Sequence, residues 1–228
     1  MLNKYLLNTK QEGEGWEMLT NLANSSVDLV ILDPQYQTSK GVSWTNYPTH
    51  IQGDYEIMEM IKEINRVLKP NAFCLLWVNK TILSKGKVAL WLVKANKLRN
   101  VDLLTWHKNR IALGHRFRNI SEFAFLLQKE PANIKSFSVK NIPNVWTEAE
   151  IPIKQRNHPH QKPKELLKQI ILATTQEQGL VVEPCAGSFI LLDICQELNR
   201  NYLGVDLTYR KMAEFINDKY HRKKPDTS

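Results

Sequence analysis

The chain has 228 residues, is 43% hydrophobic and carries a formal net charge of +8 at pH 7, which allows one sizeable core and favours a polyanionic partner such as nucleic acid. Its three cysteines show no CxxC or histidine-rich spacing, so we expect neither a disulfide framework nor a metal site. No apolar run approaches the ~20 residues of a bilayer span and no secretory leader is apparent, so we expect a cytoplasmic protein that binds no membrane.

Strand-like and helix-like segments alternate along the chain, which is typical of a doubly wound α/β fold with a mostly parallel sheet. In chain order we predict a buried strand at Val27–Leu32, a helix from an Asp54 N-cap to about residue 68, a strand at 72–78, a helix at 81–97, strands at 101–106 and 123–127, a helix from Pro163 to about 174, a strand at 180–182, a helix at 189–198, a strand at 202–205 and a closing helix at 209–220.

Four segments interrupt this alternation. The polar stretch 37–53 is a candidate substrate lid, and the stretch between the strands at 101–106 and 123–127 forms a basic loop. Three prolines break the pattern at 129–157, which we interpret as an irregular insertion rather than a second domain. We expect the tail at 222–228 to be disordered, and residues 1–228 to form a single domain.

Two apolar runs end in tight polar turns, LVILDPQY at 29–36 and LVVEPCAGSF at 180–189. Buried parallel strands deliver such turns to the carboxyl edge of an open sheet, where ligands bind. Gly187 permits a close approach of the backbone to a ligand, and Asp206 follows the next strand at a spacing that suits an acid accepting ribose hydroxyls. Neither GxGxxG nor a P-loop is present, so a ligand without phosphates is favoured over a dinucleotide. Taken alone, each turn also fits an ordinary connection in an α/β protein.

These turns, with HPHQKP at 158–163 just before the second, resemble the β-class of S-adenosylmethionine-dependent DNA amino-methyltransferases, in which the catalytic loop precedes the glycine turn. The resemblance implies a Rossmann-like class I methyltransferase fold, S-adenosylmethionine as cofactor and S-adenosylhomocysteine as product. It implies site-specific methylation of double-stranded DNA, with 129–157 as a short target-recognition insertion. It also allows a homodimer and a partner restriction endonuclease. Asp at the first position of the catalytic loop is more usual in adenine-N6 enzymes than in cytosine-N4 enzymes.

The resemblance assigns catalysis to Asp33, Pro34, Gln35 and Tyr36. An exocyclic amine is a poor nucleophile because its lone pair is delocalised into the ring. If the Asp33 carboxylate and the Pro34 carbonyl accept its hydrogen bonds, the lone pair is aimed at the methyl group, and catalysis proceeds by positioning and electrostatics. Tyr36 would stack on a base flipped out of the duplex.

The resemblance likewise predicts a cofactor site and a DNA-contacting surface. The cofactor-binding residues it implies are Glu14, Asp33, Gln161, Lys162, Pro163, Glu183, Cys185, Ala186, Gly187, Ser188, Asp206 and Leu207. Basic and aromatic residues beside the catalytic loop and in the basic loop are predicted to contact DNA: Lys40, Trp44, Lys108, Arg110, His115, Arg116 and Arg118.

Two positions depart from the family pattern. Gln35 stands where a second proline is usual, so we expect a less rigid loop before substrate binds. Phe189 stands where a second glycine is usual, and we expect it to occupy the first helical turn without strain and to narrow the methionine end of the pocket.

Four alternatives to adenine methylation remain open. They are cytosine-N4 methylation, RNA base methylation, a decayed nucleic-acid-binding module, and attack on cytosine C5 by Cys185, which its place on the cofactor side disfavours. Protein glutamine methylation is disfavoured because its Asn-Pro-Pro-Tyr loop follows the glycine turn in sequence, whereas here the corresponding loop comes first.

Overall fold

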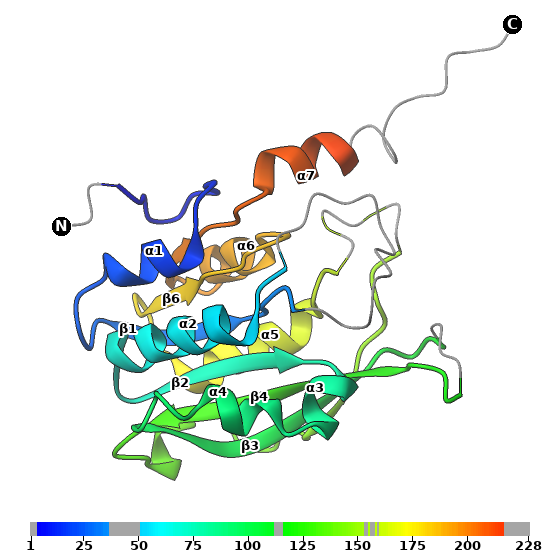
Figure 1. The fold of residues 1–228 in the computed structure, drawn as a ribbon, viewed down its shortest axis with the longest axis horizontal. Coiled ribbons are helices and arrows are strands. Elements are labelled where there is room, and N and C mark those ends of the chain that lie inside the picture. The colour runs from blue at the N-terminus through cyan, green and yellow to red at the C-terminus, as the bar shows by residue number, and fades with distance from the viewer. Residues whose placement is uncertain are drawn as a thin grey trace, which may run out of the picture.

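The computed structural model describes residues 4–36, 51–111, 116–152, 155, 158 and 160–216. These residues form one seven-stranded mixed sheet with helices on both faces (Figure 1). The spatial order of the strands is β5-β3-β4-β2-β1-β6-β7. The predicted substrate lid at 37–53 lies almost wholly outside the described residues, as do the end of the predicted closing helix at 217–220 and the tail at 222–228.

Six of the seven strands run in one direction, because β4 pairs antiparallel with both of its neighbours and every other pair is parallel. The strands are β1 Val27–Leu32, β2 Leu68–Val78, β3 Leu98–His107, β4 Ser121–Lys129, β5 Val145–Thr147, β6 Leu180–Glu183 and β7 Asn201–Gly204. The beginning of β4 therefore lies at the same edge of the sheet as the carboxyl ends of the other six strands. The expected mostly parallel, doubly wound α/β architecture is confirmed.

The helices cover two core layers because successive strand residues point to opposite faces. Val30 and Leu32 belong to one buried cluster with α2, and Leu29 and Ile31 belong to the other with α5 and α6. The helices are α1 Gly15–Thr20, α2 Asp54–Val67, α3 Lys80–Ser84, α4 Lys87–Trp91, α5 Lys164–Thr174, α6 Ile190–Glu197 and α7 Tyr209–Ile216, with a 3-10 turn at Ile134–Ser136.

Several boundaries differ from the sequence predictions. The helix predicted at 81–97 is two short helices, because Gly86 adopts a left-handed φ of 63° between them. Gly53, not Asp54, is the N-cap of α2, and the Asp54 carboxylate instead accepts hydrogen bonds from Lys87 and Trp91. β2 begins at Leu68, directly after α2 ends at Val67, whereas the sequence predicted this strand to begin at residue 72.

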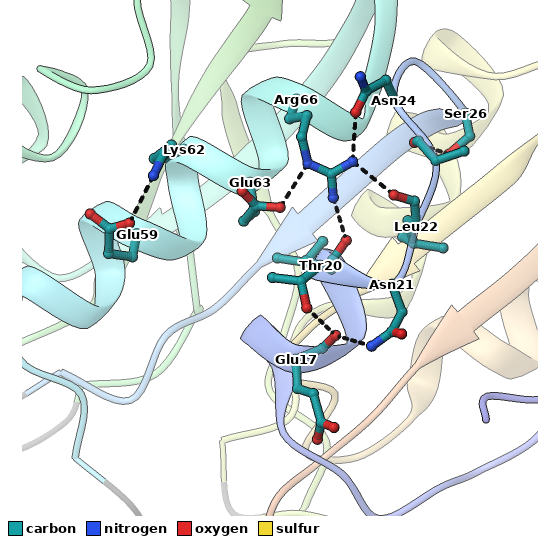
Figure 2. A network of polar contacts seen from close by, with 12 residues as sticks. Glu17, Thr20, Asn21, Leu22, Asn24, Ser26, Glu59, Lys62, Glu63 and Arg66 are labelled. Carbon is teal, nitrogen blue, oxygen red and sulfur yellow. Dashed lines mark hydrogen bonds and ion pairs between the residues drawn. The ribbon is translucent and has the colours of Figure 1, made fainter. Parts of the chain in front are cut away.

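Arg66, in the last turn of α2, fastens the α1–β1 connection to α2 (Figure 2). Its guanidinium donates to the carbonyl oxygens of Leu19 at 2.9 Å and Leu22 at 2.8 Å and to Asn24 Oδ1 at 2.7 Å, and it pairs with Glu63 at 2.8 Å. A planar guanidinium with several fixed donors is well suited to join separate segments in this way. The network holds α1 in place, and with it the residues at the start of α1 that line the pocket described below.

The described residues of the insertion at 129–157 pack against the sheet edge and α5. β5 extends the sheet beside β3, and Phe137 packs edge-on against Phe73 at 5.9 Å. Glu148 accepts hydrogen bonds from the first backbone N–H groups of α5, and its carbonyl accepts from Trp106 Nε1 at 2.8 Å. In the part of the chain that the structure describes, no helix is both long and apolar enough to cross a membrane.

Candidate active site

The predicted catalytic and cofactor turns meet at one edge of the sheet. Asp33 directly follows β1, Pro184 follows β6, and Asp206 lies two residues beyond β7. Because β4 is reversed, Glu122 near its beginning reaches the same edge. Chain topology thus gathers three carboxylates and the glycine turn where open α/β sheets bind ligands.

A pocket enclosing about 510 Å³, its open mouth included, lies beside the ends of β6 and β7 and the start of α1. Four residues predicted to bind cofactor line it, and so does Gln35 of the catalytic loop. The full lining is Glu14, Gly15, Gln35, Gln52, His158, Pro184, Cys185, Asp206, Leu207 and Thr208. Sequence reasoning missed Gly15, Gln52, His158, Pro184 and Thr208 as pocket residues, although four of them neighbour motif residues in the chain.

The Asp206 carboxylate is oriented by the backbone around it. Gly187 N–H donates to Oδ2 at 3.0 Å, while the Thr208 N–H and hydroxyl donate to Oδ1 at 2.9 and 3.0 Å. Each carboxylate oxygen can accept more than one hydrogen bond. Asp206 is therefore a fixed acceptor in the wall, with capacity left for ligand hydroxyls.

The opposite wall depends on a close approach of α1 to β6. A Cβ on Gly15 would lie 2.2 Å from the Pro184 carbonyl oxygen, so only glycine fits there. Glu14 is the N-cap of α1, and its carboxylate accepts hydrogen bonds from the N–H groups of Trp16 and Glu17. The helix cap thereby fixes Glu14 at the pocket, where sequence analysis placed it.

The glycine turn differs from expectation at Phe189. Phe189 has a left-handed φ of 57° and precedes α6, so it is a strained cap rather than an unstrained first-turn residue. Its ring is fully buried against Tyr209, at 4.9 Å between centroids, and does not line the pocket. The positive φ explains why glycine would suit this position, and the burial of an aromatic ring offsets the strain. The expectation that Phe189 narrows the pocket is wrong.

Two further residues predicted to bind cofactor lie behind the pocket wall. Glu183 is buried, its Oε2 accepts a 2.7 Å hydrogen bond from the Tyr202 hydroxyl, and burial raises the pKa of Glu183 well above its ordinary value. Ala186 is buried in the core cluster beneath α5 and α6. Both support the turn from within, as does Ser188, whose hydroxyl accepts from Ile190 N–H at 3.3 Å.

The segment HPHQKP contributes His158 to the pocket. His158 is buried, and its ring lies 3.4 Å from where a Cβ on Gly187 would stand. Burial, with smaller effects of His160 and Lys162, lowers the pKa of His158 to about 3, so the ring is neutral at physiological pH. Of the residues predicted here, Gln161 N–H donates to the His158 carbonyl and Pro163 caps α5, and neither lines the pocket.

The catalytic loop is held by Gln52. Gln35 N–H donates to Gln52 Oε1 at 3.1 Å, and Gln52 N–H donates to the Gln35 carbonyl at 2.7 Å. A proline at position 35 has no N–H and would lose the first of these bonds. The substitution that was expected to loosen the loop therefore adds a contact that fixes it. Within the loop, the Pro34 carbonyl accepts from Tyr36 N–H at 3.0 Å.

Tyr36 lies beside the loop with its ring partly buried against the core and 6.3 Å from Trp91. Burial, reinforced by the negative charge of Asp33, raises the pKa of Tyr36 above its ordinary value. The side chain is therefore a neutral phenol, which suits a stacking surface better than a base.

The Asp33 carboxylate forms an ion pair with Lys162, whose Nζ lies 2.7 Å from Oδ2. The same ammonium lies 3.0 Å from Glu122 Oε2. Although burial acts to lower it, these two carboxylates raise the pKa of Lys162 above its ordinary value. Lys162, predicted to line the cofactor pocket, instead bridges the predicted catalytic aspartate to β4.

Lys108, predicted to contact DNA, is also held by carboxylates. Its ammonium pairs with Glu122 and, at 2.9 Å, with Glu150, and the side chain is only 15% exposed. We therefore do not place it among the DNA contacts. Arg110, Arg116 and Arg118 are exposed, while Lys40, Trp44 and His115 lie outside the described residues.

The cysteines do not act as nucleophiles here. Burial, with the nearby negative charge of Asp206 and Asp33, raises the pKa of the Cys185 thiol, and burial raises that of Cys195 to about 12. Cys185 Sγ lies 3.8 Å from Gln52 Oε1, which accepts from the protonated thiol. A neutral thiol beside the pocket disfavours the cytosine-C5 mechanism.

A doubly wound sheet with a carboxylate-bearing Asp-Pro-x-Tyr loop beside a glycine-turn pocket defines a Rossmann-like methyltransferase. The chain belongs to the DNA methylase family N6_N4_Mtase, which matches residues 27–216. It is 36% identical over 214 residues to the Type II methyltransferase M.HhaII of Haemophilus parahaemolyticus, covering 89% of this chain and 92% of that protein. It is 22% identical over 240 residues to the DNA adenine methyltransferase YhdJ of Escherichia coli K12, covering 88% and 79%.

The fold is that of solved methyltransferases. The crystal structure of the M1.HpyAVI–SAM complex superposes with a TM-score of 0.64 at 21% identity, covering 91% of this chain and 98% of that one. The protein is a site-specific DNA methyltransferase that uses S-adenosylmethionine.

Proposed function

We propose that the protein methylates the N6 amino group of an adenine flipped out of double-stranded DNA. The observation that carries the proposal is the fixed Asp33 carboxylate at the end of β1, close to a pocket lined by four of the predicted cofactor-binding residues. Asp at this position favours adenine over cytosine N4, and the relative YhdJ is named as an adenine methyltransferase. Cytosine N4 is the second candidate because the family includes both specificities.

The pocket residues fit S-adenosylmethionine. We propose that Asp206 accepts hydrogen bonds from the ribose hydroxyls of the cofactor and that Glu14 and Leu207 border its adenine. Gln35, His158 and Cys185 then border the remainder of the cofactor. The Gly15–Pro184 contact keeps this wall free of side chains, and the Gly187 backbone allows close approach. The other predicted residues, Gln161, Pro163, Glu183, Ala186 and Ser188, support these from behind.

The chain's own groups perform the positioning. The bound cofactor supplies an electrophilic methyl group on a sulfonium. Asp33 Oδ1 and the Pro34 carbonyl accept hydrogen bonds from the target amino group, which draws its nitrogen toward tetrahedral geometry. Tyr36 stacks on the flipped base and holds its ring plane. The nitrogen gives up its surplus proton to solvent after transfer.

The test is a methylation assay with labelled S-adenosylmethionine and mixed-sequence duplex DNA, followed by nucleoside mass spectrometry. We expect N6-methyladenine as the product. N4-methylcytosine as the product would support the mechanism but would show that the target base is cytosine rather than adenine. Methylation of RNA but not DNA, or cofactor binding without any turnover, would refute the proposal and favour the corresponding alternative.

We propose that the exposed arginines of the β3–β4 hairpin contact the DNA. Arg116 and Arg118 flank Phe117, which is 88% exposed and has the chemistry of an apolar wedge between bases. Replacing both arginines by alanine is expected to weaken DNA binding about tenfold and to reduce the salt dependence of log K by roughly two. Fluorescence anisotropy across a salt series measures both.

The matched control replaces Lys97 and Arg99 by alanine; both are exposed basic residues at or next to the beginning of β3, the end of that strand opposite the hairpin. It removes the same charge and is expected to leave the salt slope near that of the unmodified protein. Equal losses in both double variants would show that net charge, not this hairpin, governs binding.

We further propose that residues 129–157 contribute to target recognition. We also propose that the enzyme works in the cytoplasm as the modification partner of a restriction endonuclease. Its Type II relatives support this biological role. A homodimer is part of the same proposal, and sedimentation of the purified protein with and without DNA tests it.

A further inference from the structure

We propose that Lys162 is a positioning residue for methyl transfer: it holds the catalytic carboxylate of Asp33 in place through a chain of alternating charges anchored on β3 and β4. This inference rests on the proposed function of Asp33. It gives Lys162 a different role from the cofactor contact that its sequence motif implies.

The chain of charges has five members drawn from four parts of the fold. In spatial order they are Glu150, Lys108, Glu122, Lys162 and Asp33, and each contacts the next through an ion pair. The Lys162–Asp33 and Lys162–Glu122 distances are 2.7 and 3.0 Å. Glu122 is thus shared between two lysines, and Lys108 and Lys162 are each shared between two carboxylates, so the three inner members of the chain are each held by two ion pairs.

Each of the two lysines in this chain of charges lies over a tryptophan ring. The Lys162 ammonium lies 5.1 Å from the ring centroid of Trp77, and Lys108 lies 4.8 Å from that of Trp106. The two rings pack edge to face at 6.2 Å and are almost fully buried. Cation–π contact adds to the ion pairs and restricts the lysine rotamers. With 13% side-chain exposure for Lys162, little solvent competes for its charge.

The consequence for Asp33 is geometric. Lys162 lies 2.7 Å from Oδ2, and Oδ1 is the oxygen that we assign to the amino group of the target base. A carboxylate fixed at one oxygen presents a single acceptor orientation, and misplacement of a reacting group by about 1 Å can cost about 10²-fold in rate.

The consequence for charge follows from the neighbours of Lys162. Asp33, Glu122 and the phenol of Tyr36 face its ammonium, with His160 and Lys108 nearby. Although burial opposes it, Lys162 and Lys108 lower the pKa of Glu122 to about 2. Without Lys162, Glu122 would lose one of the two cations that lower its pKa, and it would no longer be joined to Asp33 through a shared ammonium.

Lys162→Met, which keeps the length and removes the charge, tests the proposal. At saturating cofactor and DNA, kcat is expected to fall about 10²-fold, while the Kd for S-adenosylmethionine stays within about threefold, since Lys162 does not line the pocket.

Lys162→Arg keeps the charge and is expected to restore most of the kcat that Lys162→Met loses. Lys168→Met, on the outer side of α5 and paired only with Glu197 in the described residues, is the matched control and is expected to match the unmodified enzyme. Glu122→Gln removes the anchor on β4 without touching Asp33 or the pocket, and a loss of about tenfold in kcat with unchanged cofactor Kd is expected.

Three outcomes would overturn the inference. One is that Lys162→Met weakens cofactor binding but keeps kcat at saturation, which would return Lys162 to the cofactor site. Another is that Lys162→Arg loses as much kcat as Lys162→Met, which would show that the charge at this position does not matter. If Lys162→Met does not fold by circular dichroism, unchanged kcat in Glu122→Gln decides against the proposal. Failure of the unmodified enzyme to methylate DNA would instead count against the proposed function, because every comparison is a ratio to it.

Discussion

Replacing Asp33 by alanine is expected to lower kcat for DNA methylation about 10³-fold and to change the Kd for S-adenosylmethionine by no more than about threefold. The loss in rate follows because the target amino group loses its charged acceptor, and one preorganised hydrogen-bonding group at a reacting atom is worth about 10² to 10³ in rate. Cofactor binding is retained because Asp33 is not among the residues that line the pocket. Single-turnover kinetics and isothermal titration calorimetry measure the two effects separately.

Asp33→Asn separates the charge from the acceptor. Its amide oxygen still accepts a hydrogen bond, so we expect an intermediate loss, smaller than that of Asp33→Ala. Asp193→Ala, an exposed aspartate on α6, is the control and should leave both measurements unchanged. If Asp33→Ala greatly raises the Kd for S-adenosylmethionine but retains kcat at saturating cofactor, Asp33 is a cofactor ligand, as the family resemblance also allowed, and not the catalytic acceptor.

Replacing Asp206 by alanine is expected to raise the Kd for S-adenosylmethionine about 10²-fold, with kcat at saturating cofactor changed much less. Hydrogen bonds to a charged group contribute about 1.5 to 3 kcal/mol each, and a hundredfold change in Kd corresponds to about 2.7 kcal/mol. Alanine also removes the acceptor for Gly187 N–H and Thr208, so part of the loss comes from the turn itself. Calorimetric titration gives the Kd.

Asp206→Asn distinguishes these two contributions. The amide oxygen can keep one of the hydrogen bonds that organise the turn, while the charge that favours ribose hydroxyls is lost. We expect about a tenfold rise in Kd, between the unmodified protein and Asp206→Ala. Asp102→Ala, an exposed change on β3, is the control for removing an aspartate. An unchanged Kd in Asp206→Ala would exclude Asp206 from the cofactor site.

In the candidate active site, the catalytic loop and the carboxylate it carries are each held by a residue from elsewhere in the chain. Gln52 fixes Gln35 through two hydrogen bonds, and Lys162 fixes the Asp33 carboxylate through an ion pair. Both holding residues lie outside the four-residue catalytic motif. The substrate amine therefore meets an acceptor already oriented, which is the condition under which electrostatic catalysis requires little reorganisation.

The strand and turn chemistry could be predicted from local pattern. Apolar runs before Asp33 and Pro184 predicted strands that end at one sheet edge, and the order of the two motifs indicated the family, because these signals depend only on neighbouring residues. Boundaries that depend on backbone conformation were predicted less well. The break at Gly86 and the left-handed φ of Phe189 follow from packing around each residue, which a local apolar pattern does not encode.

By itself, then, the sequence determined the fold class, the two ligand-binding turns and the catalytic loop, since each is written in a contiguous run of residues. Only the tertiary structure decided what Lys162, Lys108 and Glu122 do. Their roles depend on the reversed direction of β4. This direction places Glu122 at the carboxyl edge of the sheet, where it forms ion pairs with both lysines. From the sequence alone, a lysine or glutamate is interpreted as a solvent-exposed or DNA-binding residue. In the folded protein, a buried charge is stabilised by the opposite charges that folding places around it.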